Sequence, residues 1–259
     1  MWIQNHSDVG APAGKEGTQV ADALVTGAAR GLGLALVRQL LDRGDRVFAA
    51  ARGGSEREAL RESKRAHPDS LMPIALDVAD PQSISDSVGE VRKHTDKLDL
   101  LINNAGIAGE HGGNSSTAPE PLGRVEQRNS LQVFAVNTVG PLLMVQAYRG
   151  LLARAKAPRV VNITSRMGSI EDKSSTGYYS YSASKAALNM VNKILSRELS
   201  PEGIVTIVVH PGWVQTDMGG SHATLPPEKS AAALIRLVSA LSEKDSGAFF
   251  NHDGSPLPW

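Results

Sequence analysis

Seven short apolar runs recur along the chain, separated by stretches of helical length, and this alternation limits the possible folds more than any other feature. The runs end at Gly27, Ala51, Val78, Gly106, Ser165, Gly212 and Gly254. Continuous apolar runs of this length are typical of strands buried on both faces of a parallel sheet. Right-handed helical crossovers connect such strands. The sequence therefore predicts an α/β fold, a doubly wound and mostly parallel seven-stranded sheet with helices on both faces.

The stretches between the runs carry apolar residues at helical spacing. Leu32, Leu36 and Leu40 form one stripe, and Gly44 stands where a left-handed residue ends a helix. Further helices are predicted over 82–96, 131–155, 179–199 and 228–241.

Two irregular segments, Ile107–Asn129 and Trp213–Pro227, interrupt the alternation. Both follow strand ends, where open parallel sheets bind their ligands, although either could be a plain surface loop. Residues 1–18 are predicted to be a mobile leader, and residues 19–259 a single domain.

Charge and composition exclude several classes of function. The chain has 27 Lys and Arg against 27 Asp and Glu, which argues against a nucleic-acid coat or a polybasic membrane binder. Cysteine is absent, so disulfides, thiolate catalysis and Cys-based metal sites are excluded. No apolar run approaches the roughly 18–20 residues of a membrane span, and the start lacks the pattern of a signal peptide. A cytoplasmic protein is expected.

A glycine-rich turn joins the first predicted strand to the first predicted helix. It reads TGAARGLG, with Gly27, Gly31 and Gly33 spaced differently from the usual dinucleotide fingerprint. Gly27 can make the tight turn, Gly31 can let the backbone approach a pyrophosphate, and Gly33 can let helix and strand pack closely. The helix N-terminus would attract phosphate, so nucleotide binding is predicted.

Two arginines indicate which dinucleotide the turn would bind. No acidic residue occupies 49–55, where an acid that grips the ribose 2′-hydroxyl of NAD is expected. Arg52 stands there instead, and Arg30 lies inside the glycine turn. Guanidinium groups suit a 2′-phosphate, so NADP(H) is predicted to be preferred over NAD(H), unless both arginines are simply solvated surface residues.

Tyr181 and Lys185 stand four positions apart in a predicted helix and share one face. A nearby ammonium, helped by the positive charge of an oxidised nicotinamide, favours the phenolate and is expected to lower the tyrosine pKa, which would make Tyr181 a usable acid or base. Ser165, at the end of a strand, could hold a carbonyl oxygen, and Asn137 could anchor a water beside Lys185. Each residue also has a structural explanation, and only their joint occurrence is specific.

TGAARGLG, LDV, NNAG, Asn137, Ser165 and YSASK together resemble the short-chain dehydrogenase/reductase family over nearly the whole chain. HPGWVQTDMGG and the ending DGSPLPW are similar to its branch of C-factor and sniffer-type carbonyl reductases. The resemblance implies a Rossmann-like sheet in the order 3-2-1-4-5-6-7 and a carbonyl–alcohol reaction linked to NADP(H). It implies that Tyr181 donates the proton, Ser165 positions the carbonyl, Lys185 holds the nicotinamide ribose and Asn137 completes a proton relay.

The resemblance also implies a cofactor-binding set. Asp77 would accept from the adenine amino group with Val78 beside it, and Asn103 and Ala105 would line the adenosine ribose. The complete predicted set is Gly27, Arg30, Gly31, Leu32, Gly33, Arg52, Asp77, Val78, Asn103, Ala105, Tyr181, Lys185, Pro211, Gly212, Val214 and Thr216.

Other residues near these motifs have less specific interpretations. Trp213 and Met218 are candidates for a lid, whereas Arg166 and Met167 could face substrate or pack elsewhere. A structural role is favoured for His210, because the Tyr–Lys–Ser set already supplies an acid. The histidines lack metal-ligand spacing, so no catalytic metal is predicted.

Three functions remain open. An NADPH-dependent reductase of aldehydes or ketones is favoured, because a pure binding module has no need of Tyr181. The alternatives are a C-factor-like developmental or intercellular signalling protein with little turnover and an adaptor that binds no nucleotide. The helices over 131–155 and 179–199 resemble those that pair subunits in relatives, so a homodimer or homotetramer is expected.

Overall fold

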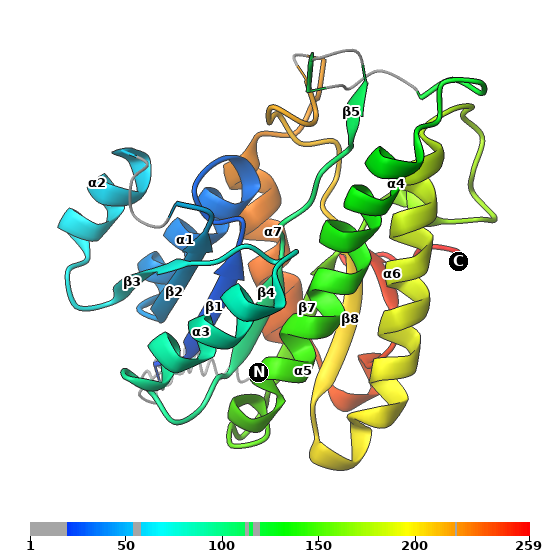
Figure 1. Cartoon of the computed structure of the whole chain (residues 1–259). Coiled ribbons are helices and arrows are strands. Elements are labelled where there is room, and N and C mark those ends of the chain that lie inside the picture. The colour runs from blue at the N-terminus through cyan, green and yellow to red at the C-terminus, as the bar shows by residue number, and fades with distance from the viewer. Residues whose placement is uncertain (1–19, 54–57, 112–113, 116–119, 221) are drawn as a thin grey trace, which may run out of the picture.

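A computed structural model of the protein describes residues 20–53, 58–111, 114–115, 120–220 and 222–259. The predicted leader lies outside the described residues. A seven-stranded sheet runs in the order β3-β2-β1-β4-β7-β8-β9, and every neighbouring pair in it is parallel (Figure 1). The α/β class predicted from the sequence and the strand order implied by the family resemblance are both confirmed. The strands are β1 (Asp22–Thr26), β2 (Arg46–Ala51), β3 (Leu71–Ala75), β4 (Leu100–Asn103), β7 (Arg159–Ile163), β8 (Val205–His210) and β9 (Phe249–Asn251).

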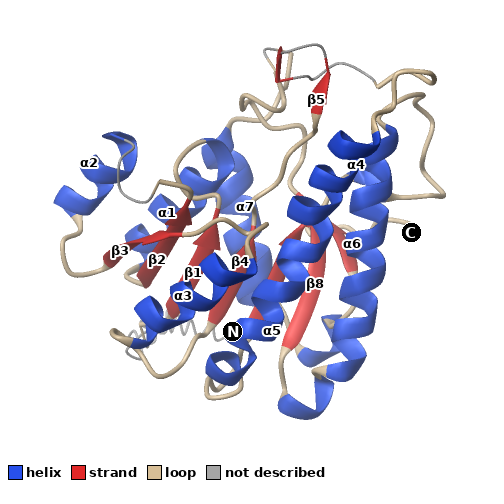
Figure 2. Ribbon diagram, in the orientation of Figure 1, coloured by secondary structure: helices blue, strands red, loops and turns tan. Residues whose placement is uncertain are grey.

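Helices cover both faces of this sheet, as Figure 2 shows. One face carries α1 (Gly31–Arg43) and α7 (Pro227–Ala240). The other carries α3 (Pro81–Arg92), α5 (Gly140–Leu152) and α6 (Tyr179–Glu198). Short 3₁₀ turns follow at Arg166–Gly168, Ser200–Glu202 and Glu243–Asp245.

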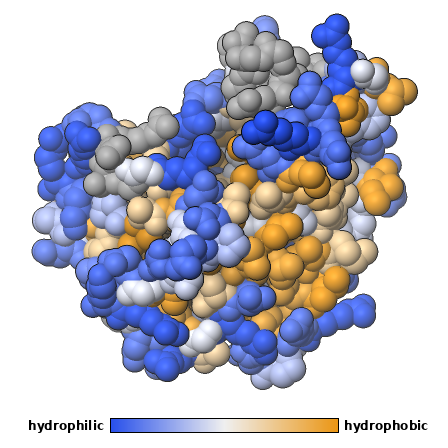
Figure 3. Space-filling model, viewed as in Figure 1, coloured by the Kyte–Doolittle hydropathy of each residue, from blue (hydrophilic) through white to orange (hydrophobic). Residues whose placement is uncertain are grey.

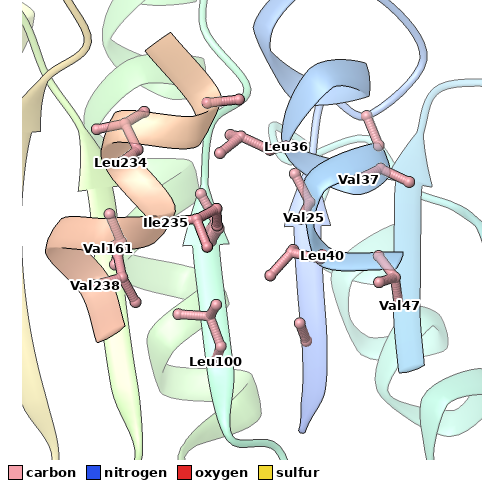
Figure 4. Close-up of a cluster of buried hydrophobic side chains, with 14 of the residues drawn as sticks. Val25, Leu36, Val37, Leu40, Val47, Leu100, Val161, Leu234, Ile235 and Val238 are labelled. Carbon is pink, nitrogen blue, oxygen red and sulfur yellow. The ribbon is translucent and has the colours of Figure 1, made fainter. Parts of the chain in front are cut away.

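Alternation along the strands divides the core into two layers. In β1, Val25 packs toward α1 and α7, whereas Leu24 packs toward the opposite helices. Figure 4 shows the first layer, where Leu36 and Leu40 of α1 and Ile235 of α7 meet the sheet. Complete burial of a Leu or Ile side chain contributes about 1.5–3 kcal/mol. The two apolar layers therefore hold the sheet in a fixed position beneath its loops.

Two described features were not predicted. Helix α2 (Glu58–Ala66) is largely charged, and Leu60 is the one large apolar side chain that it buries, so it lacks an apolar stripe. The irregular segment after β4 contains a short antiparallel hairpin, β5 (Glu110–His111) with β6 (Asn114–Ser115). Gly44 ends α1 in the left-handed region at φ 95°, as predicted.

The helix before β7 is nearly continuous from Gln127 to Leu152, through α4 (Gln127–Phe134), a π-helical turn η2 (Ala135–Val139) and α5. By length and composition this stretch is apolar enough to cross a membrane. Gln132 and Asn137 interrupt its apolar residues, so it contains no uninterrupted run of that length. In the fold it packs on the sheet through buried residues such as Met144 and Tyr148.

Candidate active site

A cavity of about 1110 Å³ opens at the carboxyl ends of the strands. Segments that follow β1, β2, β3, β4, β7 and β8 line it, so the parallel sheet brings distant parts of the sequence together. Asn103 and Asn137 are the predicted site residues that do not line it. The predicted residues that do are Gly27, Arg30, Gly31, Leu32, Gly33, Arg52, Asp77, Val78, Ala105, Ser165, Tyr181, Lys185, Pro211, Gly212, Val214 and Thr216.

The glycine turn after β1 is too crowded for side chains. Gly27 has φ 66°, and a Cβ there would lie 3.0 Å from Cα of Ala105. A Cβ on Gly31, at φ 52°, would lie 3.0 Å from the Thr216 side chain, and one on Gly33 would lie 2.2 Å from the Gly27 carbonyl oxygen. Glycine at these positions therefore lets the turn pack against the loops that follow β4 and β8.

Gly33→Ala is expected to destabilise the protein and to abolish nucleotide binding, because its Cβ would collide with the backbone of the turn. Overpacking of this kind costs about 1–3 kcal/mol or more. Thermal unfolding with and without NADPH measures both effects. Gly89→Ala in α3 is the matched control, because its Cβ would meet nothing within 4 Å and the change is expected to stabilise slightly. A G33A variant that NADPH stabilises as it does the original protein would contradict this account.

Asn103 was predicted to line the adenosine ribose, but it is not among the residues that line the cavity. Its side chain is buried and donates to Asn162 Oδ1 at 2.8 Å, within a chain of amides that continues from Asn162 to Asn192. The next residue, Asn104, lines the cavity instead and donates from Nδ2 to the Thr26 carbonyl at 2.8 Å. Asn103 is the last residue of β4 and lies within the sheet, whereas Asn104 is the first beyond it, a boundary that the repeated NN did not reveal.

The two predicted phosphate-binding arginines both reach the cavity. Arg52 is exposed at the end of β2. Arg30, the residue before α1, makes no side-chain cap hydrogen bond and forms an exposed ion pair with Asp217 of the loop after β8. Exposed ion pairs contribute only about 0–1 kcal/mol, so a phosphate can readily replace Asp217 as the partner of Arg30.

Tyr181, Lys185 and Ser165 meet at the other part of the cavity. Tyr181 lies in the first turn of α6, one turn before Lys185, and Lys185 Nζ is 5.8 Å from the centroid of its ring. Lys185 is buried and donates to the Ile163 carbonyl at 2.8 Å. Ser165, just beyond β7, accepts from the Met167 amide at 3.1 Å and lies close enough to Tyr181 to act on the pKa of its phenol. The three side chains therefore face one space.

Burial dominates the electrostatics of this group. It raises the pKa of the Tyr181 phenol, and the hydrogen bond with Ser165 offsets part of the rise. Burial also lowers the pKa of Lys185 to about 8. The predicted lowering of the Tyr181 pKa depends on Lys185 and on the positive charge of an oxidised nicotinamide; in the protein alone, the loss of water around the phenol dominates. Tyr181 therefore holds its proton at neutral pH, as a proton donor must.

Asn137 is completely buried in the π-helical turn, a type of turn that is frequent at functional sites. Its Oδ1 accepts from the Ile107 amide at 2.9 Å, and its Nδ2 donates to the Ile107 carbonyl at 2.8 Å. Nδ2 also lies 3.0 Å from Ser184 Oγ. A Cβ on Gly106 would lie 3.3 Å from Asn137 Oδ1 and 3.6 Å from Lys185 Nζ, so both side chains border the space that this glycine leaves open. The relay role of Asn137 stays a prediction.

The remaining predicted candidates also lie at the cavity. Arg166 pairs with Asp172, and Trp213 Nε1 donates to the Gly219 carbonyl at 2.8 Å. Burial lowers the pKa of His210 to about 4, so its ring is neutral at physiological pH. The loop that carries Trp213 is held by paired backbone hydrogen bonds between Trp213–Gln215 and Leu225, an arrangement that favours a fixed wall over a loose lid. Sequence reasoning missed the lining residues Asn129, Gln132, Ser175 and Tyr178, which carry no motif.

The residues present fit a nicotinamide dinucleotide. The uncapped start of α1 offers backbone N–H groups to a pyrophosphate, and glycines keep that approach open. Asp77 and Arg52 follow β3 and β2, whereas the loop from Pro211 to Thr216 follows β8, on the other side of β1, and all of them line the cavity together with Lys185.

Comparisons with known proteins agree with this arrangement. The family described as short chain dehydrogenase matches residues 21–224. The protein named C-signal of Myxococcus xanthus is 42% identical over 165 residues, which cover 64% of this chain and 95% of that protein.

Two solved structures share the fold over 93% of this chain and 100% of their own. The carbonyl reductase Sniffer of D. melanogaster has a TM-score of 0.86 at 32% identity. The NADPH-bound carbonyl reductase from chicken fatty liver has a TM-score of 0.84 at 35% identity. The chain therefore belongs to the short-chain dehydrogenase family of oxidoreductases.

Proposed function

We propose that the protein reduces an aldehyde or ketone to an alcohol with NADPH, and that Tyr181 donates the proton. The observation that carries the proposal is the meeting of Tyr181, Lys185 and Ser165 in one cavity with the glycine turn and Arg52. The printed names of two structural relatives, both carbonyl reductases, support the same reaction.

Each residue has a distinct task in this reaction. Bound NADPH supplies a hydride to the carbonyl carbon. Ser165 donates a hydrogen bond to the carbonyl oxygen and holds it where negative charge develops. Tyr181 transfers its phenolic proton to that oxygen. Lys185 stabilises the phenolate left behind, because its ammonium lies on the same helix face.

The direct test is NADPH oxidation with a panel of aliphatic and aromatic aldehydes and ketones. Turnover of at least one carbonyl with formation of the matching alcohol is expected. NADPH binding without any turnover would contradict the proposal.

The preference for NADPH over NADH depends on the arginines at the cavity. Arg52→Ala is expected to lower kcat/KM for NADPH about 10- to 100-fold and to leave NADH nearly unchanged, because a charge-assisted hydrogen bond is worth about 1.5–3 kcal/mol. Steady-state kinetics with both cofactors measure this. Arg38→Ala on the exposed side of α1 is the control. An equal decrease in kcat/KM for NADPH and for NADH would show that Arg52 does not contact a 2′-phosphate.

The similarity to C-signal favours a second candidate function, a signalling protein whose cavity binds a nucleotide with little turnover. The carbonyl panel separates the two candidates. Stabilisation of the protein by NADPH, together with a complete lack of oxidation, would favour the signalling function.

We also propose that the protein forms a homodimer through α4, α5 and α6. Apolar side chains gather on this face in Figure 3, and the exposed ones include Leu131, Leu142, Met190 and Ile194. A paired surface would explain why the stretch Gln127–Leu152 is apolar on its outer side as well as its inner side.

Met190→Lys combined with Ile194→Lys is expected to convert a dimer to a monomer, because two charges would be buried on each side of the interface. Light scattering gives the mass of both forms. A monomeric original protein would refute the dimer, whereas a double variant that stays dimeric would place the interface elsewhere.

A further inference from the structure

The first turn of α6 lacks the hydrogen bond that normally caps a helix. Its N-cap residue, Tyr178, makes no side-chain cap bond and has φ 58°, directly after Gly177 at φ 71°. Tyr178 is the only non-glycine residue at positive φ in the described part of the chain. The backbone therefore enters the helix of Tyr181 and Lys185 through two left-handed residues, a conformation that neighbouring structure must hold.

A carboxylate from a remote segment supplies the missing cap. Glu120, in the segment between β6 and α4, accepts from the Ser180 amide at 2.8 Å through Oε2. Its Oε1 accepts from Ser180 Oγ at 3.0 Å. Glu120 is 1% exposed and Ser180 is 4% exposed, so both groups are shielded from water. A negative charge at a helix N-terminus also interacts favourably with the helix dipole.

A third side chain extends this contact to α4. Ser130 Oγ lies 2.8 Å from Ser180 Oγ and donates to the Glu126 carbonyl at 3.0 Å. Glu120, Ser180 and Ser130 thus join the segment before α4, the start of α6 and α4 itself. The residue after Ser180 is Tyr181, so whatever fixes Ser180 fixes the backbone that carries the phenol.

We propose that Glu120 is a positioning residue for Tyr181, which it holds at the cavity by capping the first turn of α6 from outside the helix. This inference rests on the proposed function of Tyr181 as proton donor. Ile107, Ala108 and Gly109, at the start of the segment that leads to Glu120, line the cavity.

The test compares Glu120→Ala and Glu120→Gln with a matched control, Glu126→Ala. Glu126 belongs to the same segment, is exposed, and makes no side-chain cap hydrogen bond to α4. E120A is expected to lower kcat about tenfold or more, the size of effect that misplacement of a catalytic group produces, with the Kd for NADPH nearly unchanged. E120Q keeps one oxygen acceptor and is expected to recover most of the activity, and E126A is expected to match the original protein.

Hydrogen exchange measured by mass spectrometry gives a readout that does not need activity. E120A is expected to accelerate exchange in the first turn of α6 and to leave the amides of β1 and β4 unchanged. If the original protein turns over no carbonyl, the proposed function fails, and this measurement still decides whether Glu120 holds the start of α6.

Unchanged kcat or unchanged exchange in folded E120A would overturn the proposal. Equal losses of kcat and NADPH affinity would also overturn it, since they would show a general structural role. If E120A does not fold, Glu120→Asp decides, because its shorter side chain draws the carboxylate away from the Ser180 amide and hydroxyl. A lower kcat at unchanged NADPH affinity in E120D supports the proposal, and an unchanged kcat overturns it.

Discussion

Tyr181→Phe is expected to lower kcat for carbonyl reduction about 10²- to 10⁴-fold, the usual contribution of a general acid. The substitution removes a single oxygen atom, and the ring keeps its place beside Lys185 and Ser165. The Kd for NADPH, measured by fluorescence titration, is therefore expected to change little.

Tyr179→Phe is the matched control for this variant. Tyr179 lies two residues earlier on the same helix, is 43% exposed, and does not line the cavity. We expect it to retain full activity. A Y181F variant that keeps most of its turnover would show that another group supplies the proton.

Lys185→Met is expected to raise the free energy of unfolding of the protein. It is also expected to lower kcat about 10²-fold or more, because the positive charge that stabilises the Tyr181 phenolate is lost. Burial lowers the pKa of Lys185 to about 8, so at neutral pH the fold holds a poorly solvated cation. The gross penalty is on the order of 3 kcal/mol. Loss of the hydrogen bond to the Ile163 carbonyl offsets about 1 kcal/mol of the gain, which leaves a net increase of about 1–2 kcal/mol.

The pH dependence of stability gives this second prediction a distinctive sign. Because the pKa of Lys185 is lowered on folding, the unfolded chain binds more protons than the folded one above pH about 8. The contribution of Lys185 to the free energy of unfolding therefore rises from about pH 8 toward its ordinary pKa, and its penalty is complete below pH 8. In urea unfolding, K185M should have a larger free energy of unfolding than the original protein at pH 7, and the difference should be smaller at pH 10. A difference in the free energy of unfolding that is as large at pH 10 as at pH 7 would show that the Lys185 charge is not its cause.

The fold was accessible from the sequence because its main determinants are local and repeated. Each buried strand is a continuous apolar run, and Gly44 ends α1 through its own backbone conformation. The charged helix α2 and the β5–β6 hairpin carried no such pattern. Their placement depends on contacts that the local sequence does not describe.

Part of the candidate site could be predicted from the sequence for the same reason. Tyr181 and Lys185 are neighbours on one helix, and the glycines lie within one turn, so spacing alone predicted them. The sequence did not show which of Asn103 and Asn104 lines the cavity, because that depends on the residue at which β4 ends.

Contacts between residues far apart in the sequence could not be predicted from it. Arg30 meets Asp217 across 187 positions, and Glu120 reaches Ser180 across 60. The burial that raises the pKa of the Tyr181 phenol in the protein alone could not be read from the spacing of two residues.

The central claim is that NADPH and Tyr181 act together on a carbonyl carbon in one cavity. Incubation of the protein with NADPH that carries deuterium in place of both hydrogens on the reactive nicotinamide carbon, followed by mass spectrometry of the alcohol, tests it most directly. The account predicts one deuterium on the carbinol carbon with the original protein and almost no labelled alcohol with Y181F. Alcohol formed without deuterium, or labelled alcohol formed equally well by Y181F, would contradict it.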